Sequence, residues 1–506
     1  MSETELKLIV DPVHCAAIDS ALRRLSSKRR SIESRYYDTV DRRLAEAGLS
    51  LRLRKTGRAW EQTLKAPGAN AAERQEDTVT RPGRWGPDGP PIVPGLHAGT
   101  DTGKRLVALL DQGDRAAAEL RPAYASVVVR RSAEIDVRDA RVEVAFDRGA
   151  IRAGAASESL CEVEYELKSG AAGALVRLAR AGVVAYGMCL SIVSKAARGD
   201  RLARGDIGAP AVKARAPRIE GSMSGSVLIR AIVQACLEQI LSNASEIAAG
   251  QVSDELVHEL RIGLRRLRTA SRELVALDPS MHRDWEASLT TAFRALGDYR
   301  DRTTVAATIQ GRLAAAGSPA PTIAVSTRDS PDPVAIVRGE SFQCALLDVF
   351  DLVLGRRHDA KGRDLAIDSP ASCGPAAASA HVESRLDKLH RLLGRSAKTF
   401  ERSGESERHR VRKRLKRLRY VAELVAPLYK AREVRRYLGK LKPAQDELGA
   451  YIDLVVSSQL ARDAANGGDA EQWFNAGWLA AQQGESAKRC QRALDRASKA
   501  KPFWKR

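Results

Sequence analysis

Charged residues alternate with apolar ones in four short segments of the first half of the chain. In the first segment, Glu3, Glu5 and Lys7 occupy every second position. In a β-strand this spacing sends all three charged side chains to one face. The same alternation recurs in Leu49–Arg54, Val142–Asp147 and Glu162–Lys168. Dense rows of both signs are typical of a site that binds metal cations and a polyanion together.

The chemistry of these rows predicts a polar interior. A buried row of carboxylates is costly unless cations compensate it. Mg²⁺ and Mn²⁺ take oxygen ligands, and Mg²⁺ usually binds through one or two carboxylates, waters and substrate phosphates. Basic side chains hold phosphate oxygens, the arginines in bidentate fashion. A polar interior implies a closed strand barrel covered by helices. The predicted phosphate-binding residues are Lys7, Arg52, Arg54, Lys65, Arg74, Arg130 and Lys195.

Composition narrows the class of partner. The 506-residue chain has a net charge of +20, which favours an acidic partner such as nucleic acid, anionic lipid or polyphosphate. Aromatic residues make up only 5%, which argues against nucleic acid bound by base stacking. Seven scattered cysteines without a CxxC pair indicate neither a disulfide framework nor a zinc site. The chain has no apolar run of about 20 residues, and its N-terminus is acidic. We therefore expect a cytoplasmic protein without a membrane partner.

The chain divides near residue 210, which predicts an α+β protein. Residues 1–204 alternate as antiparallel strands, 205–224 are rich in Gly, Pro and Ser and form a linker, and 225–506 are helical almost throughout. The breakers in the helical half concentrate in 316–335 and 358–378, which we expect to be long loops.

The helical half contains an internal repeat. His258–Arg268 matches His409–Arg419 at an offset of 151 residues, and Leu296–Asp301 matches Leu448–Asp453 at an offset of 152. Two equivalent units should therefore pack as two helix bundles related by a pseudo-two-fold axis.

Each repeated helix carries a basic stripe opposite a leucine stripe. At 100° per residue, the His, Arg and Lys positions of the motif fall within about one quadrant. The duplication in register favours a groove for a linear polyanion over a merely solvated face. The two histidines are expected to bind the ligand and not to act in catalysis, because no acid or nucleophile accompanies them. The residues predicted to bind this polyanion, which the resemblance described below implies to be polyphosphate, are His258, Arg261, Arg265, Arg268, His409, Arg412, Lys416 and Arg419.

The first half resembles the CYTH domain of the triphosphate tunnel metalloenzymes. The ExExK signature is present as Glu3, Glu5 and Lys7. Further segments fall in the order of that family: Tyr36–Thr39, Leu51–Arg54, Thr63–Lys65, Arg74–Glu76, Asp147–Gly149, Glu162–Leu167 and Ser194–Gly199. The second half, about 225–500, resembles the CHAD domain, an all-helical module with paired histidine-containing helices.

The resemblance implies an inorganic triphosphatase that binds polyphosphate. It predicts hydrolysis of tripolyphosphate to pyrophosphate and phosphate with Mg²⁺ or Mn²⁺ as cofactor. The predicted metal ligands are Glu3, Glu5, Glu162, Glu164 and Glu166, and the predicted catalytic residues are Glu5, Glu164 and Lys7. Two alternatives stay open: a hydrolase or cyclase acting on thiamine triphosphate or ATP, for which Trp60 is the one candidate base-binding ring, and a polyphosphate-binding protein without turnover.

Overall fold

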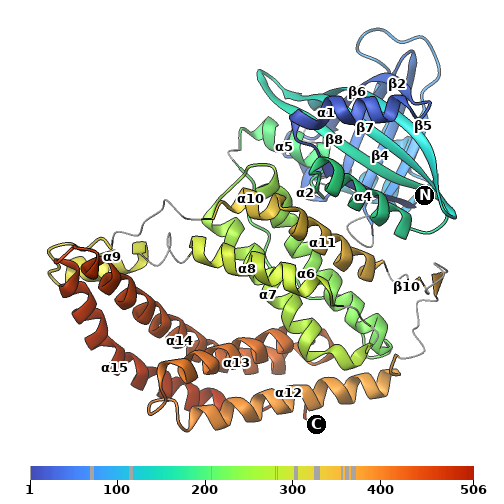
Figure 1. The fold of residues 1–506 in the computed structure, drawn as a ribbon. Coiled ribbons are helices and arrows are strands. Elements are labelled where there is room, and N and C mark those ends of the chain that lie inside the picture. The colour runs from blue at the N-terminus through green and yellow to red at the C-terminus, as the bar shows by residue number, and fades with distance from the viewer. Residues whose placement is uncertain are drawn as a thin grey trace. The chain divides into compact units, whose positions relative to one another are not determined.

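The computed structural model describes residues 2–505 except 69–72, 113–117, 207, 280, 282, 301–305, 324–330, 355–356, 359–363 and 366–371. The chain forms two compact units, shown in Figure 1. The barrel unit comprises residues 1–212, 241–252 and 337–356, and the helical unit comprises 213–240, 253–336 and 357–506. The barrel unit therefore takes two segments from the second half of the sequence, so the domain boundaries at 204 and 225 stay predictions.

Eight antiparallel strands close into the barrel that the sequence predicted. They lie in the order β5-β4-β3-β2-β6-β7-β8-β1, and β1 also pairs with β5. A two-residue strand, β9 (Cys189–Leu190), pairs with β1 as well. The eight strands are β1 (Ser2–Ile9), β2 (Lys28–Asp38), β3 (Ser50–Thr56), β4 (Ala59–Pro67), β5 (Glu73–Thr80), β6 (Arg121–Val137), β7 (Ala140–Ala153) and β8 (Ala156–Ser169).

Helices cover the apolar outer face of the barrel. Leu51 and Leu64 of neighbouring strands form one cluster with Leu44 of α2 (Arg43–Glu46) and Leu106 of α3 (Asp101–Leu110). The helix α4 (Gly173–Tyr186) packs on β1 and β8, and α1 (Cys15–Arg23) packs on β6. Burial of these leucines against the helices fixes which face of each strand points inward.

Two further helices complete the barrel unit. The helix α5 (Lys195–Arg204) packs on β6, β7 and β8. The helix α11 (Glu340–Val353) packs against α4, and Arg180 of α4 forms an ion pair with Asp348 of α11. The helix α11 begins 171 residues after the end of β8 and still belongs to the same compact unit as the strands.

The helical unit reproduces the predicted repeat. The helix α7 (Asp254–Glu273) is followed by a 3₁₀ turn at Val275–Leu277 and by α8 (Trp285–Arg300). The helix α13 (Glu405–Leu424) is followed by a 3₁₀ turn at Ala426–Leu428 and by α14 (Ala431–Asn466). The remaining elements are α6 (Gly225–Ala248), which runs on into the barrel unit, α9 (Ala306–Ala315), α10 (Pro333–Arg338), α12 (Pro375–Ala397), α15 (Gln472–Ser498) and the short strands β10 (Arg357–His358) and β11 (Asp364–Leu365).

Among the described residues, α6 is long and apolar enough to cross a membrane by length and composition, which the sequence reading missed. Buried positions make up 67% of its apolar window, and core helices of soluble proteins pass the same test. The expected loops at 316–335 and 358–378 lie partly outside the described residues, and α10 begins inside the first of them.

Candidate active site

The strand register brings the predicted charged residues of the first half onto the inner face of the barrel. Residues directly opposite each other on paired strands share a face. The partners run from Glu3 and Arg74, through Lys7 and Glu164, to Arg130 and Asp147. The inward-facing set is Glu3, Glu5, Lys7, Arg52, Arg54, Lys65, Arg74, Arg130, Glu162, Glu164 and Glu166.

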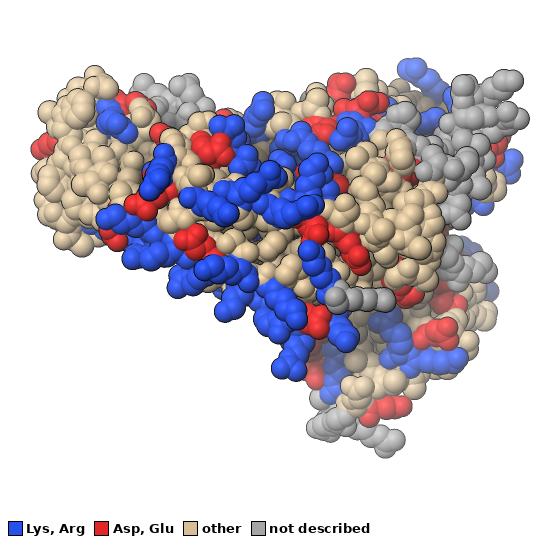
Figure 2. Space-filling view, turned by 90° about the horizontal axis from the view of Figure 1, so that it is seen from below, with Lys and Arg blue, Asp and Glu red and all other residues tan. Residues whose placement is uncertain are grey.

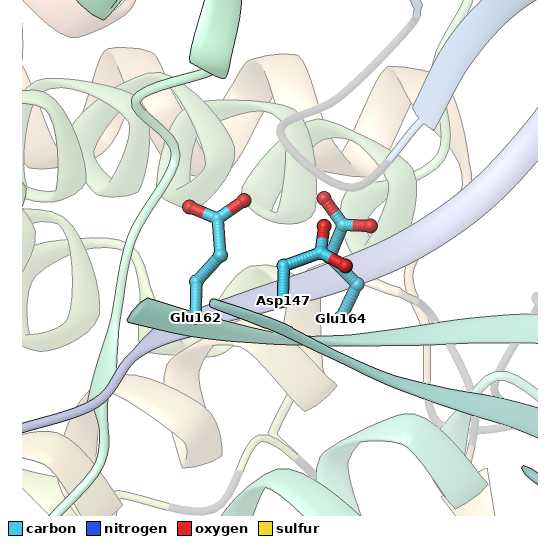
Figure 3. Close-up of side chains that lie close together, drawn as sticks. All are labelled: Asp147, Glu162 and Glu164. Carbon is cyan, nitrogen blue, oxygen red and sulfur yellow. The ribbon is translucent and has the colours of Figure 1, made fainter. Parts of the chain in front are cut away.

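Three carboxylates converge at one end of this lumen. One ligand oxygen from each of Asp147, Glu162 and Glu164 lies within 4.8 Å of the others (Figure 3). Lys195 Nζ lies 2.8 Å from Asp147, 2.5 Å from Glu162 and 2.7 Å from Glu164. Arg130 adds a bidentate bond to Asp147, with both distances 2.7 Å. Burial alone would raise the pKa of Glu164, but Lys195 and Arg130 hold it well below its usual value.

Lys195 reaches the cluster from the first residue of α5. Ser194 caps the helix by accepting a hydrogen bond from Ala197 N at 3.1 Å. A Cβ atom on Gly199 would lie 2.1 Å from the Tyr124 ring, so glycine is needed for α5 to approach the barrel this closely. The Ser194–Gly199 segment thereby fixes where the ammonium group stands.

A second charged group surrounds Glu3. Lys65 Nζ lies 3.1 Å from Glu3 and also pairs with Glu76, and Arg52 lies 3.8 Å from Glu76. Burial and a hydrogen bond with Glu76 raise the pKa of Glu3 to about 8. The hydrogen bond with Glu3 and the charge of Lys65 lower the pKa of Glu76 against the effect of burial, so the two carboxyl groups titrate as a pair.

The other predicted residues of β1 and β8 lie next to the three-carboxylate cluster but do not belong to it. Glu5 faces Glu166 across the strands, and Glu166 accepts a hydrogen bond from Lys168 at 2.6 Å. Lys7 faces Glu164, and its ammonium group donates to the backbone carbonyl of Val193. Of the five predicted metal ligands, the structure therefore brings Glu162 and Glu164 into the cluster.

The arginines of β3 form the cationic wall of the lumen. Burial, followed by the charges of Arg52 and Arg130, lowers the pKa of Arg54 to about 10. The Nε atoms of Arg52 and Arg54 are buried and have no hydrogen-bond partner among the described residues. Burying such a donor without an acceptor costs about 1–3 kcal/mol. An anion in the lumen would supply the missing acceptors.

The donor set of the cluster fits a hard divalent cation. Three buried or half-buried carboxylates supply oxygen ligands, which Mg²⁺ and Mn²⁺ prefer. The Lys195 ammonium group contacts all three, which shows that the carboxylates are already spaced around one positive charge. Asp147, Glu162 and Glu164 would hold the metal ion.

The sequence analysis named Asp147 and Glu76 in its charged segments but assigned neither of them a role in the site. Asp147 ends the alternating segment that begins at Val142, so its parity already placed it with Glu143. Glu76 follows Arg74 by two residues and shares its face. Alternation could have found both, but only the register shows that Asp147 lies opposite Glu162.

In the helical unit, the stripe of α7 lies along one aromatic ring. The guanidinium carbons of Arg261, Arg265 and Arg268 lie 5.1, 5.0 and 5.4 Å from the ring centroid of Phe293 on α8. A Cβ atom on Gly297 would lie 2.8 Å from Arg261 Nη2, so the glycine of the Leu296–Asp301 motif makes room for that side chain. Asp301, the last residue of the motif, lies outside the described residues.

The two stripes meet at Lys416. The helices α7 and α13 pack together. Burial, followed by the positive charges of Arg265, Arg412 and Arg261, lowers the pKa of Lys416 to about 6, while Asp453 opposes the shift. Burial together with Lys413, Arg412 and Lys416 also lowers the pKa of His409. We call Arg261, Arg265, Arg412 and Lys416 the basic cluster.

The remaining stripe residues are placed differently. Arg419 bonds to Glu423 at 2.6 Å and to Gln445 at 2.5 Å, so its charge is already engaged. Burial and the charge of Arg272 lower the pKa of Arg268. His258 lies half-buried on α7.

Figure 2 shows Lys and Arg side chains gathered in a band on the surface. The helices α13 and α14 carry the exposed residues Arg410, Lys413, Arg432, Arg435 and Lys440.

Known proteins match both halves of the chain. The CYTH domain family matches residues 1–199 and the CHAD domain family matches residues 231–462. An inorganic triphosphatase from Haemophilus influenzae is 27% identical over 184 residues, which are 34% of this chain and 46% of that protein. The chain therefore spans about half the length of that curated relative.

Two solved structures are also similar. The crystal structure of the CHAD domain from the plant Ricinus communis has a TM-score of 0.43 and 23% identity, covering 57% of this chain and 97% of that one. A Hippeastrum protein described as an adenylyl cyclase with a dominant triphosphatase activity has a TM-score of 0.27 and 16% identity, covering 40% and 97%. With both domain families matched in the order that the sequence predicted, the chain belongs to the CYTH–CHAD proteins, in which a CYTH domain precedes a CHAD domain.

Proposed function

We propose that the barrel unit hydrolyses inorganic tripolyphosphate to pyrophosphate and phosphate with a divalent cation. CYTH proteins act on triphosphates as hydrolases or cyclases and depend on metal ions. The observation that carries the proposal is the lumen itself, where Asp147, Glu162 and Glu164 converge beside a wall of buried arginines. Phosphoryl transfer depends mainly on positioning and electrostatic stabilisation, which such an arrangement supplies.

The cations of the lumen bind and orient the substrate. Arg52 and Arg54 offer buried Nε donors, which suit non-bridging phosphate oxygens. Arg130 and Lys195 are held by carboxylates, so they stand at fixed positions beside the cluster. Lys7 and Arg74 face the same lumen from β1 and β5. Because these groups are already ordered, the charge that develops on phosphate is stabilised without rearrangement of the protein.

Acidic residues would hold the metal ion. When bound at Asp147, Glu162 and Glu164, a divalent cation offsets the charge of the phosphate oxygens and favours attack by water. We assign Glu5 and Glu166 a supporting role, because they face each other next to the cluster without joining it.

The structure gives little support to an organic triphosphate. Trp60, the ring considered for a base, lies on the outer side of its strand, since its neighbour Glu61 faces inward with Arg54. Trp60 is 3% exposed, packs on Gly89 and lies 5.6 Å from Lys55 Nζ. It is therefore not available to a nucleotide or thiazolium ring in the lumen.

A substrate panel tests this function. The full chain is assayed with tripolyphosphate, ATP, thiamine triphosphate and long-chain polyphosphate, each with Mg²⁺, with Mn²⁺ or with excess chelator. We expect tripolyphosphate to have the highest kcat/KM and chelator to abolish its hydrolysis. A preference for ATP or thiamine triphosphate would replace this proposal with the organic one, and turnover that survives the chelator would exclude the metal role.

We also propose that the helical unit binds long-chain polyphosphate. The basic cluster gathers three arginines from α7 and α13 around a lysine whose charge is suppressed by burial and by these neighbours. Like charges crowded in this way are relieved by an anion. A thin, flexible chain of phosphates can follow the two helices, whereas double-stranded DNA is rigid and wide. The cytoplasmic location that the sequence predicted stays a prediction.

A further inference from the structure

The ring of Phe293 on α8 lies beside all three arginines of the α7 stripe. The guanidinium carbons of Arg261, Arg265 and Arg268 lie within 5.4 Å of the ring centroid. A cation within about 6 Å of an aromatic centroid is attracted by the electron density of the ring face. Among the described residues, no other ring has more than two cations at this distance. The three cations are therefore gathered around one side chain.

The spacing of these arginines makes such an attraction necessary. Arg261, Arg265 and Arg268 are four and three residues apart, so they lie on one side of α7. Like charges at this spacing destabilise a helix because they repel one another. Free arginine side chains also sample many rotamers, and a ligand that orders them must offset the lost entropy. A neighbour that attracts all three reduces both costs before any ligand binds.

An aromatic ring attracts a guanidinium group in a different way from a hydrogen-bond acceptor. The ring interacts with the positive charge, whereas a carboxylate or amide oxygen takes up individual N–H donors. Arg268 illustrates the result, because its Nε atom is buried and has no hydrogen-bond partner among the described residues. Phosphate oxygens are strong acceptors for such donors. The ring thus holds the charge of Arg268 in place and leaves this donor for an anion.

The second repeat has a different residue at the same position. At the offsets of the repeat, Phe293 corresponds to Gln445 of α14, and Arg268 corresponds to Arg419. Gln445 Oε1 accepts a hydrogen bond from Arg419 at 2.5 Å, and Glu423 accepts another at 2.6 Å. The equivalent position therefore contacts the last arginine of the stripe in both repeats. It is an aromatic ring in the first repeat and a hydrogen-bond acceptor in the second.

We propose that Phe293 is a positioning residue that holds the three arginines of α7 in a row for the phosphates of a linear polyphosphate, which makes the α7 stripe the stronger half of the binding site. The inference rests on the proposed binding of polyphosphate by the helical unit. Because the ring orders the cations in advance, less conformational freedom is lost on binding. In the second repeat, the ligand must first displace Gln445 and Glu423 from Arg419.

The test compares Phe293→Leu with Phe293→Trp in the full chain. Leucine keeps an apolar side chain at this half-buried position but has no aromatic face, and tryptophan has the face that attracts cations most strongly. Binding of long-chain polyphosphate is titrated at fixed salt, and the Tm of each variant is measured. We expect affinity to fall about tenfold in Phe293→Leu and to stay within about twofold of wild type in Phe293→Trp, the scale of cation–π contacts.

Matched changes in the second repeat serve as controls. Gln445→Leu removes one acceptor from Arg419 and should weaken binding less than Phe293→Leu does. Arg268→Gln and Arg419→Gln each remove one positive charge from equivalent positions. We expect Arg268→Gln to weaken binding more, because Arg419 is already engaged by two acceptors.

Each outcome decides a stated part of the inference. An unchanged affinity in Phe293→Leu, or an equal loss in Phe293→Leu and Phe293→Trp, overturns the positioning role. Equal losses in Arg268→Gln and Arg419→Gln overturn the ranking of the two stripes. If Phe293→Leu or Phe293→Trp does not fold, Phe293→Met or Phe293→Tyr replaces it with the same expectation. If the wild-type chain does not bind polyphosphate, the proposed function fails and the inference fails with it.

Discussion

The cations of the lumen and those of the basic cluster have different neighbours. In the lumen, Lys195 contacts three carboxylates and Arg130 contacts two, so these two cations are paired with acids before any ligand binds. In the basic cluster, the charges of Arg265, Arg412 and Arg261 lower the pKa of Lys416 after burial, and Asp453 opposes them. Acids and bases held at fixed distances can select a ligand by geometry, whereas neighbouring like charges select mainly by charge.

The largest effect is expected from the carboxylate cluster. Asp147→Asn keeps the volume of the side chain but removes a negative charge beside Glu162 and Glu164. We expect hydrolysis of tripolyphosphate to fall at least about a hundredfold, because preorganised electrostatic stabilisation is worth that much in a transition state. Steady-state kinetics at saturating metal measure it. The control is Asp136→Asn, at an exposed end of β6, which should be neutral, and near wild-type turnover of Asp147→Asn would contradict the assignment.

Charge reversal in the basic cluster should remove polyphosphate binding but spare hydrolysis. Arg265→Glu combined with Lys416→Glu places two negative charges at the point where α7 and α13 meet. Binding of long-chain polyphosphate, measured by titration at increasing salt, should be lost, because the electrostatic part of polyanion binding comes from neutralised phosphates and released counterions.

The controls for charge reversal keep the net charge equal. Arg432→Glu combined with Lys440→Glu changes exposed residues of α14 and should weaken binding far less. Double-stranded DNA is offered as a competitor at equal phosphate concentration. A preference for DNA would replace the polyphosphate proposal with a nucleic-acid one, and loss of tripolyphosphate hydrolysis would show that the two sites are not separate.

Truncation tests how far the barrel depends on the second half of the sequence. A fragment of residues 1–204 contains every proposed lumen residue and should keep metal-dependent hydrolysis. It lacks the buried residues Gln343 and Phe350 of α11, so we expect its Tm to lie at least about 5 °C below that of the barrel in the full chain, as the loss of a few kcal/mol of packing would produce. Circular dichroism and activity are measured together. A folded but inactive fragment would show that hydrolysis needs the helical half.

The smallest expected effect is a pH dependence of stability and of polyphosphate affinity. Because burial and its neighbours lower the pKa of Lys416 to about 6, this lysine is neutral at pH 8 in the free protein, whereas the unfolded chain keeps it charged. Between these two pKa values the unfolded state binds more protons, so stability rises with pH in that window and falls toward pH 6. A bound polyanion should return the proton, and affinity should rise as pH falls from 8 to 6.

Calorimetry in buffers of different ionisation enthalpy measures this uptake. At pH 8 the wild-type chain should take up about one more proton on binding polyphosphate than Lys416→Met does. His409, whose pKa is also lowered by burial and neighbouring cations, is present in both proteins, so its uptake cancels from the difference. Equal uptake by the two proteins would show that Lys416 is not the group that titrates.

Alternation and repetition made much of this fold predictable. Charged residues at every second position of β1, β3 and β8 predicted the lumen, and the duplicated motif predicted the equivalence of α7 and α13. Such patterns are local, so one segment is enough to read them. The grouping of carboxylates is not local, because Asp147 meets Glu162 only through the register of β7 and β8.

Other features depend on contacts between distant parts of the chain. Nothing near Leu190 indicates that Gln343 will bond to it, since tertiary packing brings the two together. The sequence analysis also predicted that all four residues of each stripe bind the polyanion, but Arg419 bonds to Glu423 and Gln445. A helical wheel shows which side a residue faces and not which partner it finds there.

The pairing of β1 has a consequence for the order in which the chain folds. The first strand of the barrel in chain order, β1, pairs with β8, whose Glu166 lies opposite Glu5. At roughly 5–20 residues per second, β1 waits about ten seconds or more for this partner during synthesis. During synthesis the charged, weakly apolar face of β1 keeps this waiting strand soluble, so the same residues that bind phosphate in the folded protein protect the nascent one from aggregation.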